Sequence, residues 1–270
     1  MGRAIPPAPT LFKEIGLGDA LKLAVVYPWS VEMGWTRCFH SMLRLKHPEN
    51  CEVEFFRGLG WCSARRHVHC FEQALAWKAD VICVLGADQV YHDRDMLCKL
   101  IGHYREGHDV LSALVSMRGM ISDQDALPFD TVGWRVIPDD NGNISFHDGL
   151  KKNQFERVRR EHGELVRFHA GGSGVLMFPA SALSKMQPPW VTEWPSWPTF
   201  DRKAAADSNF LTRLQTEAGL EMWMDTTIKV NHLHPFEIDD TFPQRFADWA
   251  DGGGDVSICA YKPKMEMQAV

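Results

Sequence analysis

The chain has 270 residues, of which 45% are hydrophobic and 24% charged, the composition of an ordinary globular protein. Its formal net charge of −6 argues against non-specific electrostatic binding of nucleic acid, because such binding depends on Lys and Arg neutralising phosphates. A local basic face is still compatible with this charge. The seven cysteines include no Cys-x-x-Cys pair, which favours reduced thiols in a cytoplasmic protein. No apolar run reaches the roughly 18 residues of a membrane-spanning helix, so we expect no membrane span.

The first half of the chain alternates apolar runs with helical patterns. Strands are predicted at Leu21–Tyr27, Cys51–Phe56, Val81–Leu85 and Asp109–Ser116. Helices are predicted between them at Gly34–Lys46, Ser63–Lys78 and Arg94–Arg105, the second with Ser63 as its N-cap. Strands that alternate with helices indicate an α/β fold with a mostly parallel central sheet flanked by helices.

After Met117 the pattern loosens, and turns separate shorter elements. Short strands are predicted at Trp134–Ile137, Leu165–Phe168, Val175–Phe178 and Met222–Met224, and an amphipathic helix begins at Asp207 and ends at Gly219. Asn141-Gly142 predicts a hairpin in the first of these regions. No linker-like run of Gly, Ser or Pro divides the chain, so we expect a single domain over residues 1–270.

Asp88 is the first candidate for chemistry, because it follows the strand predicted at Val81–Leu85. The carboxyl ends of strands in an open α/β sheet are where such folds bind ligands. A carboxylate there suits Mg²⁺ or Mn²⁺, which take oxygen ligands and bridge phosphates. The alternative is that Asp88 belongs to a turn or caps the next element.

His232 and His234 are the second candidates. Both precede Pro235, which favours extended backbone, and in a strand they would point to one side. An imidazole can hold a divalent metal, and Asp88 would be its partner in ligation. Two structural histidines are the alternative.

Three further features admit two interpretations each. Asp207 at a helix start suits either a catalytic base or the helix dipole. Arg65 and Arg66 at the start of another helix suit either a substrate phosphate or a surface salt bridge. A Pro- and Trp-rich segment could stack on sugar or base faces or pack on the core, and its tryptophans are Trp190, Trp194 and Trp197.

Four blocks, in this order, resemble the nucleotide-sugar-dependent glycosyltransferases of the GT-A fold, in their family-2-like branch. They are the opening strand Leu23–Pro28, the stretch from Ala64-Arg65-Arg66 to Asp88, the glycine-rich strand Gly171–Phe178, and Asp207–Phe210 with the later Val230-Asn231-His232. Together they span roughly residues 20–235. The resemblance implies a GT-A-like fold with a nucleotide-sugar-binding half at approximately 20–117, an acceptor-binding and catalytic half at 118–235 and a C-terminal extension at 236–270.

The resemblance also implies roles for individual residues. A divalent cofactor, Mn²⁺ or Mg²⁺, would be held by Asp88, the second acid of the family's Asp-x-Asp motif, and by His232, with His234 as the fallback. Asp207 falls on the general base. The implied donor-binding residues are Pro28, Arg65, Arg66, Gly86, Ala87 and Asp88, and the implied acceptor-binding residues are Gly172, Ser173, Gly174, Trp194 and Trp197. The chain departs from the family at Gly86, which replaces the first acid of the motif, at Ala206, which replaces a Glu, and at Arg66, where Asn is common.

The implied activity is that of a metal-dependent, hexosyltransferase-type glycosyltransferase, with UDP-sugar as the first expectation for the donor. A single displacement would invert the anomeric centre, and retention stays open because the sequence does not fix the geometry. One alternative is a non-catalytic nucleotide- or sugar-binding module with a degenerate metal site. Another is a sugar-phosphate nucleotidyltransferase, whose usual early Gly- and Lys-rich signature the sequence lacks. The acceptor stays open among a glycan, a lipid-linked sugar, a small molecule, a protein and a modified nucleic-acid base.

Overall fold

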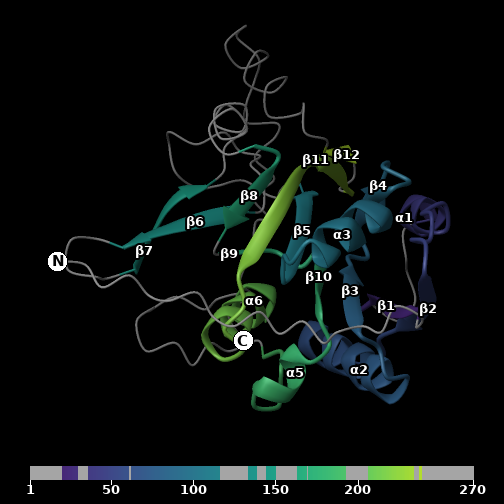
Figure 1. Cartoon of the computed structure of the whole chain (residues 1–270), viewed down its shortest axis with the longest axis horizontal. Helices are drawn as coiled ribbons and strands as arrows, with labels where there is room; N and C mark the ends of the chain where they lie inside the picture. Colours follow the sequence, from purple (N-terminus) through teal and green to yellow (C-terminus); the bar gives the residue numbers. More distant parts are fainter. Residues whose placement is uncertain are drawn as a thin grey trace, which may run out of the picture.

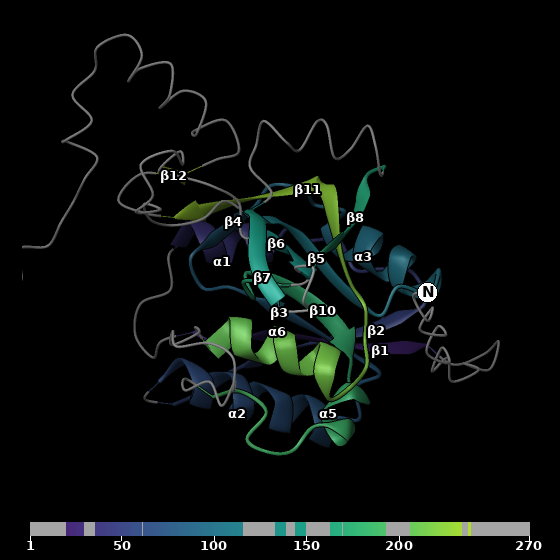
Figure 2. The same cartoon turned by 90° about the vertical axis from the view of Figure 1, so that its left-hand side faces the viewer.

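A single nine-stranded sheet forms the centre of the computed structural model, which describes residues 20–29, 36–60, 62–115, 133–138, 144–149, 163–168, 170–192, 206–233 and 237–238 (Figures 1 and 2). Its strands are β1 (Leu21–Tyr27), β2 (Cys51–Arg57), β3 (Val81–Leu85), β4 (Gln89–Tyr91), β5 (Val110–Val115), β8 (Leu165–Phe168), β10 (Val175–Pro179), β11 (Met222–Leu233) and β12 (Glu237–Ile238). The main path runs β12-β11-β5-β10-β3-β1-β2, while β4 and β8 pair with β11. Strands β1, β2, β3, β5 and β11 share one direction, and β10 is inserted antiparallel between β3 and β5.

Helices cover both faces of this sheet. They are α1 (Thr36–Met42), α2 (Ser63–Ala76), α3 (Met96–Arg105), α5 (Ala182–Lys185) and α6 (Ala206–Thr216). Helices α2, α5 and α6 pack on one face, where Figure 2 shows α2 and α6 side by side, and α1 and α3 pack on the other. Strand β3 contributes to the hydrophobic core on both faces of the sheet. Ile82 and Val84 belong to the core under α2, α5 and α6, and the core under α1 and α3 contains Val81, Cys83 and Leu85. Burial on both faces explains why its five residues are all apolar.

A smaller sheet of β7 (Ile144–Gly149), β6 (Gly133–Pro138) and β9 (Ala170–Gly171) lies beside the main one. Strands β6 and β7 pair antiparallel, in agreement with the hairpin predicted at Asn141-Gly142, although the turn itself lies outside the described residues. None of the described helices has the length and apolar character that crossing a bilayer requires.

The predicted fold class is confirmed, as an α/β fold with a mostly parallel central sheet flanked by helices. Several local bounds differ from the prediction, among them the end of α1 at Met42 and the start of α3 at Met96. The N-cap of α2 is Cys62 and not Ser63, and the helix ends before Lys78, whose φ of 62° is left-handed. The strand predicted at Met222–Met224 continues to Leu233, because its second half pairs with β4 and β12.

Candidate active site

The candidate site lies along the edge of the sheet where β1, β2, β3 and β5 end. Because β10 runs antiparallel, its first residue, Val175, pairs with Leu85 at the end of β3 and brings the glycine-rich segment 171–174 to the same edge. The backbone N–H of Gly86 donates to the carbonyl of Gly174 at 2.8 Å, which joins the loop after β3 to that segment. The carboxyl edge of the parallel strands is the usual ligand-binding edge of such sheets.

Asp88 and His232 meet at this edge. Strand β4 pairs antiparallel with β11, so that Gln89 lies opposite His232, and the backbone N–H of Leu233 donates to the carbonyl of Asp88 at 2.6 Å. Nε2 of His232 lies 3.1 Å from Oδ2 of Asp88. The two side chains are 13% and 27% exposed, so both are sheltered but reachable from solvent.

The donor set of this pair fits a divalent ion. A carboxylate oxygen and an imidazole nitrogen suit Mn²⁺, and the oxygen suits Mg²⁺. Within the described ranges, no three residues of the His, Cys, Asp and Glu types gather into a metal-binding group. Among the described residues, Asp88 and His232 would supply two ligands, and substrate oxygens and water would supply others.

Asp207 lies in the first turn of α6 and is half-buried. The backbone N–H of Ser173 donates to its Oδ2 at 3.4 Å, so the acid and the glycine-rich segment are in contact. Contacts thus lead from Asp207 through the segment 171–174 to the loop that carries Asp88. The structure brings together Asp88, His232, Asp207, Gly86 and Ser173, which the sequence places far apart.

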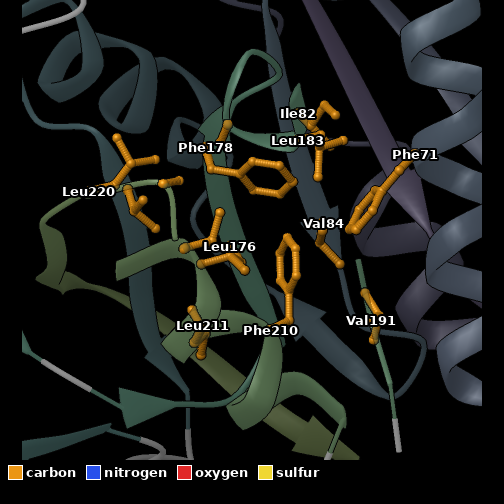
Figure 3. Close-up of a cluster of buried hydrophobic side chains, with 14 of the residues drawn as sticks. Phe71, Ile82, Val84, Leu176, Phe178, Leu183, Val191, Phe210, Leu211 and Leu220 are labelled. Carbon is orange, nitrogen blue, oxygen red and sulfur yellow. The ribbon is translucent and has the colours of Figure 1, made fainter. Parts of the chain in front are cut away.

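An aromatic cluster fixes the helix that carries Asp207. Phe210 of α6 lies 5.2 Å from Phe71 of α2 and 5.3 Å from Phe178 of β10 between ring centroids (Figure 3). All three rings are buried, and burying such a side chain contributes roughly 1.5–3 kcal/mol. Asn209 is also buried, and its amide donates to Thr192 Oγ1 at 2.5 Å. The start of α6 is therefore held by packing on both sides.

The predicted donor-binding arginines have local partners. Arg65 is exposed, with Nη1 3.6 Å from Glu72 Oε1, which is the surface salt bridge weighed above. Nη1 of Arg66 donates to the carbonyl of Gly60 at 3.3 Å and holds the loop between β2 and α2. A role in binding the donor stays a prediction for both arginines, as it does for Pro28 and Ala87, which are half-buried at the same edge of the sheet.

Several predicted residues lie outside the described ranges or belong to the core. His234, Trp194 and Trp197 fall outside the described residues. Trp190 is described, and its Nε1 donates to the carbonyl of Leu183 at 3.0 Å while its ring lies 6.4 Å from that of Phe71. This tryptophan packs on the core.

Gln89 is a site residue that sequence reasoning missed. It is 4% exposed, and its Nε2 donates to Asp88 Oδ1 at 3.1 Å. Its side chain fills the space between Gly86 and Gly174. Gly86 and Gly174 lie far apart in the sequence, so no sequence signal pointed to a side chain that needs the room beside both glycines.

No family model and no curated protein matches this chain. A search of solved structures finds A197 from STIV, with 14% identity and a TM-score of 0.45, over 79% of this chain and 86% of that one. It also finds GalNAc-T7, solved with UDP, GalNAc and Mn²⁺, with 13% identity and a TM-score of 0.48, over 81% of this chain and 45% of that one. This chain thus spans less than half of the GalNAc-T7 chain. At such identities and TM-scores, neither similarity assigns a family or an activity to this chain.

Proposed function

We propose that this protein is a metal-dependent glycosyltransferase that moves a sugar from a nucleoside diphosphate donor, a UDP-sugar in the first instance, to an acceptor hydroxyl. The observation that carries the proposal is the contact of Asp88 with His232 at the carboxyl edge of the sheet. An oxygen and an imidazole donor, both sheltered and at the ligand-binding edge, are suited to an ion on a diphosphate.

Asp88 and His232 would hold the ion, and diphosphate oxygens and water would complete its coordination. A divalent ion bound there would neutralise the negative charge that develops on the leaving diphosphate. Pro28, Gly86 and Ala87 lie on loops at the same edge, Arg65 and Arg66 lie in the first turn of α2, and all five would contact the donor.

Asp207 acts as the general base. Its carboxylate takes the proton of the acceptor hydroxyl while the hydroxyl oxygen attacks the anomeric carbon. The bond from that carbon to the diphosphate breaks, and its electron pair stays on the phosphate oxygen. The transition state is oxocarbenium-like, as in glycoside hydrolysis, and a single displacement inverts the anomeric centre. The N–H of Ser173 on Oδ2 of Asp207 supports this role, because it orients the carboxylate beside the acceptor segment Gly172, Ser173 and Gly174.

The test begins with the donor. A screen of nucleotide sugars with Mn²⁺ by thermal unfolding should identify a ligand that raises the melting temperature, since a ligand that binds only the folded state stabilises it. With that donor, Asp207→Asn should lower turnover by roughly 10²–10⁴-fold, the usual contribution of a general base, and leave the thermal shift unchanged.

Asp95 provides a matched control, since it stands at the start of α3 as Asp207 stands at the start of α6. Asp95→Asn removes a helix-start carboxylate without touching the site, and turnover should stay at the wild-type level. Full turnover in Asp207→Asn would rule out Asp207 as the base.

A nucleotide- or sugar-binding module is the second candidate, and Gly86 favours it, because the first acid of the motif is absent. A nucleotide sugar that stabilises the protein in the presence of Mn²⁺, with neither transfer nor hydrolysis by the wild type, would select this function.

A further inference from the structure

The side chain of Gln89 is enclosed by the loops that build the candidate metal site. Its Nε2 donates to Oδ1 of Asp88 at 3.1 Å, and the hydroxyl of Tyr91 lies 3.5 Å from its Oε1. The same hydroxyl donates to the carbonyl of Gly86 at 2.8 Å. Gln89 and Tyr91 are both buried, so the amide is oriented by its neighbours and not by solvent.

The amide of Gln89 fills the space that a side chain at residue 86 or at residue 174 would need. A Cβ built on Gly86 would lie 1.8 Å from Oε1 of Gln89, and one on Gly174 would lie 2.9 Å from its Nε2. Real Cβ atoms do not approach other atoms so closely, so any side chain at residue 86 would displace the Gln89 amide. An acid at residue 86 and the observed Gln89 amide are therefore mutually exclusive.

We propose that Gln89 is the positioning residue of Asp88 and that it stands in place of the missing acid at residue 86. The amide of Gln89 donates a hydrogen bond to Oδ1 of Asp88, while Oδ2 of Asp88 faces His232. One carboxylate oxygen is thereby reserved for the amide, and the other is aimed at the candidate metal position. This inference rests on the proposed function, and it gives a physical reason for Gly86.

Mn²⁺ affinity, measured by electron paramagnetic resonance of the free ion, tests the proposal. Gln89→Ala removes the amide and its N–H donor, and it should weaken Mn²⁺ binding at least about tenfold, the lower range for the loss of an outer-shell partner. Gly86→Ala should cause a similar loss by displacing the amide. The double variant Gly86→Ala, Gln89→Ala should be no weaker than Gly86→Ala, because both changes remove one contact.

Gly102→Ala is the matched control, because a Cβ on Gly102 in α3 would meet no atom within 4 Å. It should bind Mn²⁺ as the wild type does. Unchanged affinity in Gln89→Ala, or losses that add in the double variant, would overturn the role of Gln89.

A second measurement separates this inference from the proposed function. In protein labelled with ¹⁵N-glutamine, the side-chain amide resonance of Gln89, assigned by its loss in Gln89→Ala, should move in Asp88→Ala and in Gly86→Ala but not in Gly102→Ala. If the wild type binds neither Mn²⁺ nor any nucleotide sugar, the proposed function fails, and this resonance still decides the contact. A resonance that does not move in Asp88→Ala overturns the inference.

Discussion

Strand β11 carries two histidine–aspartate contacts of the same chemistry in different surroundings. Near its start, Oδ2 of Asp225 lies 3.0 Å from Nε2 of His103, and near its end Nε2 of His232 lies 3.1 Å from Oδ2 of Asp88. The side chain of Asp225 is 5% exposed, whereas that of Asp88 is 27% exposed. The first pair joins β11 to α3 and has the more buried acid, whereas the second lies at the carboxyl edge of the sheet.

The remaining contacts of the two acids differ as well. Oδ1 of Asp225 accepts from the backbone N–H of Thr227 at 2.8 Å and from its hydroxyl at 2.6 Å. These bonds lie where the pairing of β11 with β5 shifts register, between Asp225 and Lys229, so Asp225 holds an irregular turn of the strand in place. Oδ1 of Asp88 accepts from the amide of Gln89, the first residue of β4 and part of the candidate site itself.

The difference shows that a histidine–carboxylate pair does not by itself indicate function. A pair whose acid is buried and hydrogen-bonded by residues of its own strand contributes to stability. A partly exposed pair at the ligand-binding edge can exchange its mutual contact for a ligand. The two pairs should therefore respond in opposite ways to the same substitution.

The largest effect is expected from Asp225→Ala. Removing the acid leaves the N–H and hydroxyl of Thr227 and the ring of His103 without their observed acceptor, and each hydrogen-bonding group left unsatisfied costs roughly 1–3 kcal/mol. Urea denaturation would measure the loss. Glu106→Ala is the control, because Glu106 contacts the exposed side of His103 and is itself 68% exposed, so the stability should change little. A loss below about 1 kcal/mol in Asp225→Ala would place this pair with ordinary surface ion pairs.

The second effect is expected from Asp88→Ala and concerns ligand binding. Mn²⁺ affinity should fall by about 100-fold or more, since a direct ligand matters at least as much as an outer-shell partner. The free energy of unfolding without metal should change by less than about 1 kcal/mol, because the carboxylate is partly solvated. Asp225→Ala, kept folded at low temperature, should retain wild-type Mn²⁺ affinity. The reverse pattern, with stability lost at Asp88 and metal binding lost at Asp225, would exchange the two assignments.

The sequence is informative where a pattern is local. The apolar run at Val81–Leu85 predicts β3 residue for residue, because a strand buried on both faces excludes polar side chains, and the run at Leu21–Tyr27 predicts β1 with Lys22 as its one charged residue. The position of Asp88 just after β3 follows from the same pattern. Its closeness to His232 was implied only by the family resemblance, and the role of both residues as ligands stays a prediction.

Other features depend on information that no local pattern carries. A strand has the same apolar pattern in either direction, so the reversal of β10 could not be predicted from Val175–Phe178. The pair of His103 and Asp225 joins a helix to a distant strand, and no spacing rule connects them. Gln89 looks like an ordinary polar residue in the sequence, and only the three-dimensional closeness of Gly86 and Gly174 reveals its position.

A third histidine sharpens the contrast, because His67 of α2 is buried without such a carboxylate contact. Its Nδ1 lies 2.9 Å from the carbonyl of Ser63, and among the described residues its Nε2 has no hydrogen-bond partner. Burial lowers the pKa of His67 from its ordinary value of 6.5, against smaller opposing contributions from the Ser63 carbonyl and the charge of Asp207. The folded protein therefore keeps this ring neutral at a pH at which the unfolded chain binds a proton.

The smallest effect is expected in the pH dependence of stability. The contribution of a neutral His67 is fully present above pH 6.5 and is lost as the pH falls from there through the lowered pKa of the folded state. His67→Asn keeps a donor for the Ser63 carbonyl and removes the titrating ring. Urea denaturation at a series of pH values between about 5 and 8 should show a smaller loss of stability on acidification in His67→Asn than in the wild type. His40→Asn on the exposed face of α1 should keep the wild-type slope, and an unchanged slope in His67→Asn would mean that the ring is already protonated or hydrated in the folded state.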